Sequence, residues 1–343
     1  MSQTKASGVD RKAKLKSTLM QNAIYIALAI IIISVVAVEP TFLSIRNLTT
    51  ILQQAAPKLI IALGVAGILI LGGTDLSAGS MVGMAGVLCA SLLQATTYSL
   101  RIFPNLPQLP LFVPLLLAML VCLVFSVIHA FMVSTLKIAP FIASLGMQML
   151  VYGAMSLYFD GVNHSSPIGG LDSRYASFTQ GSFYIGSFRL PYIVIYAIVV
   201  TAVFWVIWNK TTLGRNMFAV GGNPEAATVS GINNKKVFTI VYMLAGLCFA
   251  FAGFLDAGRT GSATNMLGDG YQMDAIAACV VGGISMRGGI GKISGVIIGV
   301  LIFQVINYGL IYINVNIYLQ YIIRGAIILA AIAVDTQKYL KKR

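Results

Sequence analysis

The sequence predicts an all-α polytopic membrane protein with about ten transmembrane helices and both termini in the cytoplasm. Hydrophobic residues make up 58% of the chain and charged residues only 10%, whereas a soluble domain carries roughly 25% charged residues. Apolar runs of about 20 residues, long enough to cross a bilayer core, recur along the chain. Lysines and arginines concentrate in alternate loops, as is typical of membrane proteins. A soluble fold is therefore excluded.

The expected spans follow one another with few long interruptions. They lie at about residues 19–38, 48–71, 76–95, 112–136, 139–159, 191–208, 238–257, 272–287, 294–313 and 317–334. The first run is too long for a signal-peptide core and lacks a small-residue cleavage site, so we expect it to be retained. Only the turn GGTDLSAG separates the second and third runs, and SMRGGIGKIS the eighth and ninth. Eight spans remain an alternative if the second and third runs, or the eighth, are broken or re-entrant.

The charge distribution orients these spans. Tails and loops on one side hold sixteen lysines and arginines, and those on the opposite side hold five. This bias places both termini in the cytoplasm. We expect a basic cytoplasmic N-tail at 1–18, a single transmembrane domain at 19–334 and a basic cytoplasmic C-tail at 335–343. The net charge of +13 is spread over several loops, so nucleic acid is not an expected partner.

Motifs for catalysis or metal binding are missing from the sequence. The four cysteines lie inside apolar runs, and His129 and His164 each stand alone, so neither residue type has metal-ligand spacing. The string GGIGKIS looks like a phosphate-binding loop, but Ile293 follows Lys292 and the glycine required upstream of Gly291 is missing. We expect no catalytic residue, no metal site and no cofactor in this chain.

The polar cytoplasmic loop at about residues 209–237 predicts a short capped helix. Asn223 can cap its start, Pro224 has no N–H to leave unpaired, and Glu225 suits the positive first turn. Gly231 can close its end in the left-handed conformation. A helix of about 10 Å is marginal alone, so we expect it to pack on the protein while Glu225, Ala226 and Ala227 face a soluble partner. The expected coupling residues are Gly221, Gly222, Asn223, Pro224, Glu225, Ala226, Ala227, Ser230 and Gly231.

Isolated polar residues suggest a translocation path. The candidates are Thr74, Asp75, Asn265 and Asn307. An acid at membrane depth is costly, so Asp75 either caps the third span or serves in gating or polar-solute passage. Around the outer turn SATNMLGDGYQMD, the acids Asp256, Asp269 and Asp274 are either solvated loop residues or the mouth of a path.

Two further features leave alternatives open. Glycines at four-residue spacing indicate close helix packing within the chain, or a dimer or moving interface. They are Gly79 with Gly83, and Gly291 with Gly295 and Gly299. The outer segment at 160–191 interleaves aromatic residues with glycine and serine. It is either a connector or a docking lip for an external protein.

Three strings resemble the membrane permeases of monosaccharide ABC importers. They are TTLGRNMFAVGGNPEAATVSGI in the polar loop, GGTDLSAGS near residue 75 and DAIAACVVGG at 274–283. These ribose- and galactose-type permeases belong to the larger group that includes branched-chain amino-acid permeases, and the resemblance covers essentially the whole chain. The strings PTFLSIRNL, AGRTGSATNMLG and INYGLIYINVNIYLQYIIRGAII look closest to the galactose and methyl-galactoside branch.

The resemblance implies a multi-pass inner-membrane protein that moves a monosaccharide, galactose or a methyl galactoside, from periplasm to cytoplasm by alternating access. It implies four partners: a second permease copy in a homodimer, a tandem-fused cytoplasmic ATPase that binds ATP and Mg²⁺, a periplasmic sugar-binding protein, and membrane lipid. The capped helix then matches the family's coupling element. An ion-coupled secondary transporter, with Asp75, Asp256 or Asp274 as relay, and a passive channel are the alternatives. Because the polar residues of the spans are isolated along the sequence, we expect the path to bind sugar weakly.

Overall fold

The computed structural model describes residues 23–186 and 188–340, and most of them are helical. The described residues form two compact units, where the sequence predicts one domain over 19–334. The central unit is Thr49–Leu301, and the terminal unit combines the residues up to Leu48 with those from Ile302 onward. Each unit is described by itself. The predicted N-tail at 1–18 lies outside the described residues.

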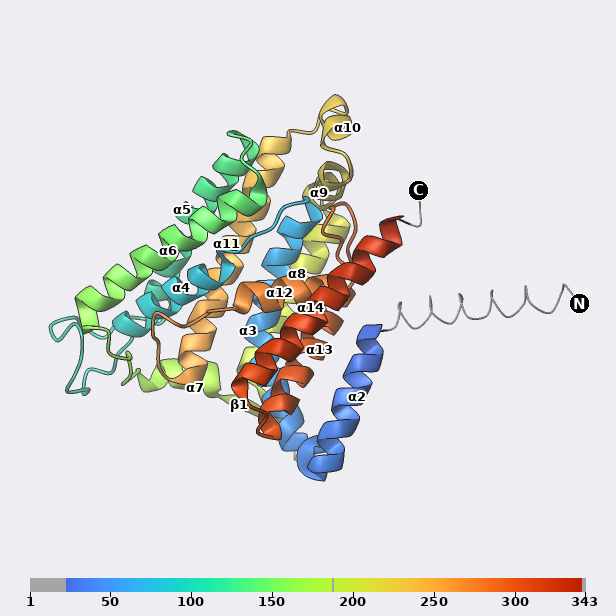
Figure 1. The fold of residues 1–343 in the computed structure, drawn as a ribbon. Coiled ribbons are helices and arrows are strands. Elements are labelled where there is room, and N and C mark those ends of the chain that lie inside the picture. The colour runs from blue at the N-terminus through green and yellow to red at the C-terminus, as the bar shows by residue number, and fades with distance from the viewer. Residues whose placement is uncertain (1–22, 187, 341–343) are drawn as a thin grey trace, which may run out of the picture. The chain divides into compact units, whose positions relative to one another are not determined.

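The central unit is built mainly from helices, some long and some short (Figure 1). Its elements in chain order are α3 (Ile45–Ile70), α4 (Ala78–Leu92), α5 (Phe112–Ser134), α6 (Pro140–Asn163), α7 (Ser173–Gln180), β1 (Ser182–Ile185), β2 (Phe188–Pro191), α8 (Tyr192–Lys210), α9 (Thr212–Gly222), α10 (Pro224–Val229), α11 (Asn234–Thr260), α12 (Tyr271–Val281) and α13 (Ile293–Tyr312). Helices α3 and α13 also extend into the terminal unit. Helix α11 packs most extensively against α5 and α4, and this contact forms the core.

The terminal unit holds α2 (Ala23–Val38), the 3-10 helix η1 (Pro40–Leu43) and α14 (Ile317–Leu340), with one end each of α3 and α13. Phe42 is buried against the rings of Tyr308 and Tyr312, at centroid distances of 6.1 and 5.5 Å. The Tyr308 hydroxyl donates to Asn47 Oδ1 at 2.8 Å. Helix α14 continues to Leu340, so the predicted start of the C-tail at 335 falls inside a helix.

Every expected span coincides with a helix within the described residues, but the helices differ in length. Six are long and apolar enough to cross a membrane, namely α3, α5, α6, α8, α11 and α13. Helix α4 has 15 residues and α12 has 11, so at 1.5 Å per residue they are about 22 and 16 Å long, short of a core of roughly 30 Å. The third and eighth runs therefore form helices shorter than a full span, and the number of spans stays a prediction. The orientation of the termini stays a prediction.

Close packing within the chain accounts for the spaced glycines. A Cβ on Gly79 would lie 2.4 Å from the carbonyl oxygen of Gly268, and one on Gly295 would lie 1.9 Å from that of Gly282. Both contacts join elements of the central unit, which confirms the internal-packing interpretation for these positions. The four cysteines are free and buried, in agreement with a packing role.

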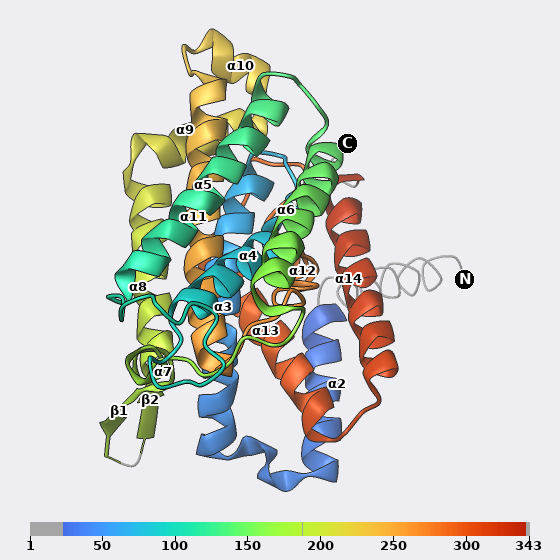
Figure 2. The same cartoon turned by 90° about the vertical axis from the view of Figure 1, so that its left-hand side faces the viewer.

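The outer segment at 160–191 is more ordered than a connector, and it departs from the predicted all-α class. It contains α7 and a two-stranded antiparallel hairpin in which Phe183 pairs with Leu190. Gly186 turns the hairpin with a φ of +61°, which glycine adopts without steric cost. Within the central unit the hairpin lies at the end opposite α10 (Figure 2). The sequence underestimated it because each strand has only four residues.

An ion pair fixes the start of α7. Asp172 is 3% exposed, and its Oδ1 accepts the backbone N–H of Arg174 at 2.8 Å, as expected of an N-cap. Arg174 Nη2 lies 2.7 Å from Asp172 Oδ2, and Gln108 Nε2 donates to the same oxygen at 2.8 Å. The hydrogen bonds from the Arg174 side chain, opposed by burial and assisted by Gln108, lower the pKa of Asp172 to about 2.

This ion pair predicts a pH-dependent contribution to stability. A carboxyl group with a lowered folded-state pKa stabilises the fold fully above its ordinary value of 3.8, and the contribution is lost as the pH falls toward about 2. Asp172→Asn, which keeps a capping oxygen, should lower the thermal unfolding temperature at pH 7 and by a smaller margin at pH 3. Arg174→Gln removes the same pair and should not add to the effect of Asp172→Asn. A temperature difference that is equal at both pH values would contradict the assignment.

Candidate functional site

Helix α10 has the caps that the sequence predicts at both ends. Asn223 Oδ1 accepts the N–H groups of Glu225 and Ala226, each at 3.0 Å, and Pro224 occupies the first turn. At the other end Gly231 adopts a φ of +81°, and its N–H donates to Thr228 O at 2.9 Å. The local sequence thus determines where this six-residue helix begins and ends.

The start of α11 holds α10 in place. Asn234 Nδ2 donates to the Pro224 carbonyl at 2.8 Å and to Thr228 Oγ1 at 2.9 Å. Ala227 is only 4% exposed, so the expectation that it faces a partner was wrong. Ala227 is the buried residue of the helix and faces inward.

The outer surface of α10 is formed by Glu225, Ala226 and Val229. All three are exposed, and Val229 is 90% exposed, which is unusual for a branched apolar side chain. Ser230, also exposed, donates its hydroxyl to Ala226 O at 2.9 Å and so supports the end of the helix. Figure 1 shows α10 projecting past the ends of α9 and α11.

Two of the predicted coupling glycines differ in their surroundings. Gly221 is buried, and a Cβ placed on it would lie 1.7 Å from Ile70 O and 2.8 Å from the backbone nitrogen of Gly289. The Gly289 N–H donates to Ile70 O at 2.8 Å. A Cβ on Gly222 would meet nothing within 4 Å. We name the contact of Ile70, Gly221 and Gly289 the glycine junction. It joins the base of α10 to the segments that follow α3 and α12.

Asp75 lies in the non-helical segment between α3 and α4. It is 1% exposed, and its Oδ1 accepts the backbone N–H of Ser77 at 2.8 Å and the Ser77 hydroxyl at 2.6 Å. The carboxylate thus orders the turn before α4, close to the capping role weighed from the sequence. His129 Nδ1 is 3.7 Å from Asp75 Oδ1, which is beyond hydrogen-bonding distance. The His129 ring also packs edge-on against Tyr242, with centroids 4.7 Å apart.

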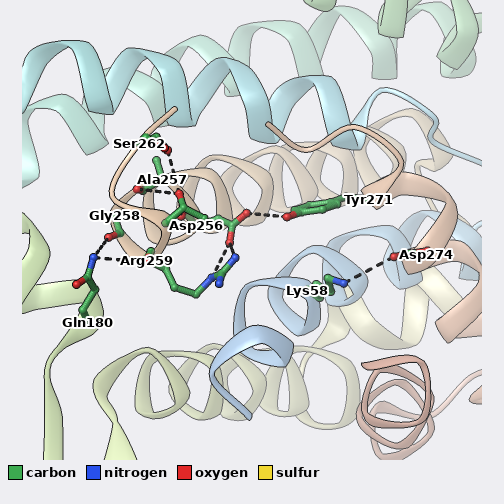
Figure 3. Close-up of polar contacts among 10 residues, drawn as sticks. Lys58, Gln180, Asp256, Ala257, Gly258, Arg259, Ser262, Tyr271 and Asp274 are labelled. Carbon is green, nitrogen blue, oxygen red and sulfur yellow. Dashed lines mark hydrogen bonds and ion pairs between the residues drawn. The ribbon is translucent and has the colours of Figure 1, made fainter. Parts of the chain in front are cut away.

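The acids near the outer turn are mostly ion-paired (Figure 3). Asp256, expected in a loop or path mouth, lies on α11 and is 1% exposed. Its Oδ1 is 2.7 Å from Arg259 Nη2, and its Oδ2 accepts the Tyr271 hydroxyl at 2.8 Å. Lys58 Nζ lies 3.7 Å from Asp274 Oδ2. These pairs join α3, α11 and the start of α12.

One of the predicted path residues, Asn265, lines a cavity of about 210 Å³. The cavity lies between the start of α4, the middle of α6 and the segment that leads into α12. Its polar lining is Ser80, Gln148, Tyr152, Asn265, Asp269 and Gln272. Of the acids around the outer turn, Asp269 therefore lines a cavity, and the role of this turn as the mouth of a path stays a prediction.

The other predicted path residues lie elsewhere. Thr74 and Asp75 belong to the turn before α4 and do not line this cavity. Asn307 is 3% exposed on the part of α13 that belongs to the terminal unit. Sequence reasoning missed Gln148, Tyr152 and Gln272. The signal available was the pair of polar residues four apart on the otherwise apolar α6, since positions i and i+4 share a helix face.

Comparison with known proteins places the chain among membrane permeases. Residues 47–332 match the family model described as "Branched-chain amino acid transport system / permease component". The galactose/methyl galactoside import permease of Haemophilus influenzae is 50% identical over 332 residues, which cover 97% of this chain and 98% of that protein. The same-named permease of Escherichia coli is 48% identical over 98% of this chain and all of that protein. The Escherichia coli ribose import permease is 34% identical over 94% of this chain and 96% of that protein. No solved structure matches.

The two neighbouring glycines of the coupling segment predict opposite outcomes on substitution. Gly221→Ala should lower the free energy of unfolding by about 2 kcal/mol or more, because its Cβ would separate the backbones of the glycine junction. Gly222→Ala should be neutral or stabilise by up to about 1 kcal/mol, because alanine favours helix and this site is open. Thermal and denaturant unfolding of the purified variants measure both. Equal stability of the two variants would show that the glycine junction is not as close as described.

Proposed function

Since the chain belongs to the branched-chain amino acid transport system/permease component family, we propose that it is the permease subunit of an ATP-driven importer of galactose and methyl galactosides. It is a multi-pass protein of the inner membrane. The substrate follows from the likeness to galactose/methyl galactoside import permeases, which extends over 97% of the chain at 50% identity. The ribose permease is similar over nearly the same length but at 34% identity, so galactose is the better-supported sugar.

The observation that carries the ATP-driven mechanism is the capped, outward-facing α10. A helix of six residues has no internal stability of its own, yet here two caps and Asn234 hold it rigidly beyond the ends of longer helices. Rigid presentation of a helix face is what docking into a groove of another protein requires. The sequence offers no phosphate-binding loop, so the ATP and Mg²⁺ sites belong to the partner. We assign that partner as a cytoplasmic ATPase whose two domains are fused in tandem.

The other proposed partners are a periplasmic sugar-binding protein and a second copy of the permease. A periplasmic sugar-binding protein would dock at the outer end of the central unit, where the hairpin exposes Phe183 and Tyr184 at 55% and 66%. A second copy of the permease would complete the path, as a homodimer embedded in lipid. Alternating access would then open this path to each side of the membrane in turn as the ATPase binds and hydrolyses ATP.

The paired acids favour this function over an ion-coupled secondary transporter. A proton or sodium relay needs carboxylates that can exchange their partner during transport. Asp256 and Asp274 are instead ion-paired with Arg259 and Lys58. Asp75 is buried and hydrogen-bonded to Ser77. These contacts give the three acids a structural role, so none of them is a candidate for an ion relay.

The energy source can be tested in membrane vesicles that contain the permease, its ATPase and its binding protein. Uptake of radiolabelled galactose should continue when ionophores collapse the ion gradients, and it should stop when ATP is depleted. Vesicles that lack the permease are the control. Uptake that follows the ion gradient and ignores ATP would overturn the proposal.

The docking role of α10 can be tested at Val229. Val229→Asp should reduce ATP-driven uptake at least tenfold, about 1.4 kcal/mol, because docking would bury an unpaired charge. Since Val229 is 90% exposed, the unfolding temperature should change little. The conservative Val229→Leu should retain uptake. Normal uptake by Val229→Asp would place the docking surface elsewhere.

A further inference from the structure

The cavity between the start of α4, the middle of α6 and the segment that leads into α12 has a polar lining to which the proposed function assigns no role. Three amide side chains reach it, from Gln148, Asn265 and Gln272, together with the hydroxyls of Tyr152 and Ser80 and one carboxylate, Asp269. Amides both donate and accept hydrogen bonds, and so do hydroxyls. The lining includes no lysine, arginine or histidine. This composition suits a neutral ligand rich in hydroxyl groups rather than an anion.

Gln272 supplies the strongest indication of a ligand. It is 5% exposed, and its Oε1 has no hydrogen-bond partner among the described residues. Buried amide oxygens normally have a partner, because leaving one unpaired destabilises the fold. Gln272 lines the cavity, so a rotation of its side-chain amide would offer this unpaired acceptor to a donor on a ligand. Gly79 makes room for it, because a Cβ at that position would lie 2.2 Å from the same oxygen.

The breaks in the membrane helices place two helix N-termini beside the cavity. Gly79 and Ser80 are in the first turn of α4, and Gln272 is in the first turn of α12. The N-terminal end of a helix carries a partial positive charge, which favours oxygen atoms of a ligand. Short helices that begin at a substrate site are also a recurring arrangement in transporters.

The exposure of the lining indicates that this face does not meet lipid. Tyr152 is 42% exposed, and Asp269 is exposed as well. A carboxylate in contact with hydrocarbon is costly, so this side faces water or another protein chain. Met155 and Leu267 form an apolar part of the wall against which the C–H face of a sugar ring can pack.

The cavity is large enough for one sugar ring. Its volume of about 210 Å³ is many times the space that a single bound water needs, so a monosaccharide with its hydroxyls fits. We propose that this cavity is an intramembrane binding site for a single monosaccharide, held by Gln148, Tyr152, Asn265 and Gln272.

This proposal rests on the proposed function, and it revises the expectation of a path with only isolated polar residues. The side chains are far apart in the sequence, but the fold brings them to one cavity. Gln272 would accept a hydrogen bond from a sugar hydroxyl, and Gln148 and Tyr152 would meet the ring from α6. The site would hold the sugar between its arrival from the binding protein and its release into the cell.

A cysteine in the cavity tests binding without requiring transport. Ser80→Cys lines the cavity, while the four native cysteines are buried. Galactose at tens of millimolar should slow the reaction of this cysteine with a methanethiosulfonate reagent at least twofold in the purified permease. Sucrose at equal osmolarity should leave the rate unchanged, and so should galactose for Ala226→Cys on α10. Equal rates for Ser80→Cys with and without galactose would overturn the site.

Transport by isosteric variants supplies the second test. Gln272→Leu removes an unpaired oxygen, so the unfolding temperature should be equal or higher while galactose uptake falls at least tenfold. Tyr152→Phe should also lower uptake. Tyr158 lies on the same helix, but its hydroxyl is hydrogen-bonded to the Ser91 hydroxyl at 2.8 Å. The control variant Tyr158→Phe should therefore transport galactose normally. Full uptake by both cavity variants would overturn the site.

The two proposals fail in distinguishable ways. If the unmodified chain transports galactose with ATP but neither protection nor loss of uptake is seen, the cavity assignment is wrong and the function stands. If the unmodified chain shows no ATP-driven galactose uptake, the proposed function is wrong whatever the labelling shows. Protection of Ser80→Cys together with impaired uptake by Gln272→Leu supports both.

Discussion

Every helix break at membrane depth must pair its free backbone groups inside the protein, because lipid offers no hydrogen-bond partner. The central unit meets this constraint by bringing backbone against backbone. At the glycine junction, Ile70 O at the end of α3 accepts the Gly289 N–H at 2.8 Å, and Gly221 lies so close that no side chain fits between them. Gly79 and Gly268 approach each other in the same way at the start of α4. Without these contacts the short helices α4 and α12 would leave unpaired groups and could not persist.

The same breaks create the polar chemistry of the unit. A continuous membrane helix would satisfy its N–H groups with its own hydrogen bonds, whereas α4 and α12 each begin beside the cavity. Gln272 and Gly79 occur at these turns, and α6 contributes Gln148 and Tyr152 from the side. The hydrogen bond from the Tyr271 hydroxyl to Asp256 and the ion pair Lys58–Asp274 fix the start of α12 relative to α11 and α3. Structural charges and cavity-lining amides are therefore neighbours on α12, with different tasks.

The position of α10 connects its end of the central unit to these breaks. Its caps make it rigid, Ala227 packs inward, and the adjoining Gly221 belongs to the glycine junction. Under the proposed function, docking at the exposed Val229 face would act through the glycine junction on the backbone that leads into α4 and away from α12, the two helices that begin at the cavity. Close backbone contacts suit this role, because packed interfaces shift between discrete arrangements rather than deforming smoothly.

The sequence by itself determined the local features: the apolar runs that became helices, the caps Asn223 and Gly231 that bound α10, and the missing nucleotide motif. These depend on residues within one or two helical turns, which is the range over which periodicity and capping act. Only the tertiary structure decided which runs are broken, that Ala227 faces inward, that Asp256 is ion-paired, and that Gln148, Asn265 and Gln272 share a cavity. The cavity, for example, joins Gln148 to residues more than a hundred positions away, and a single sequence carries no record of which distant segments approach one another.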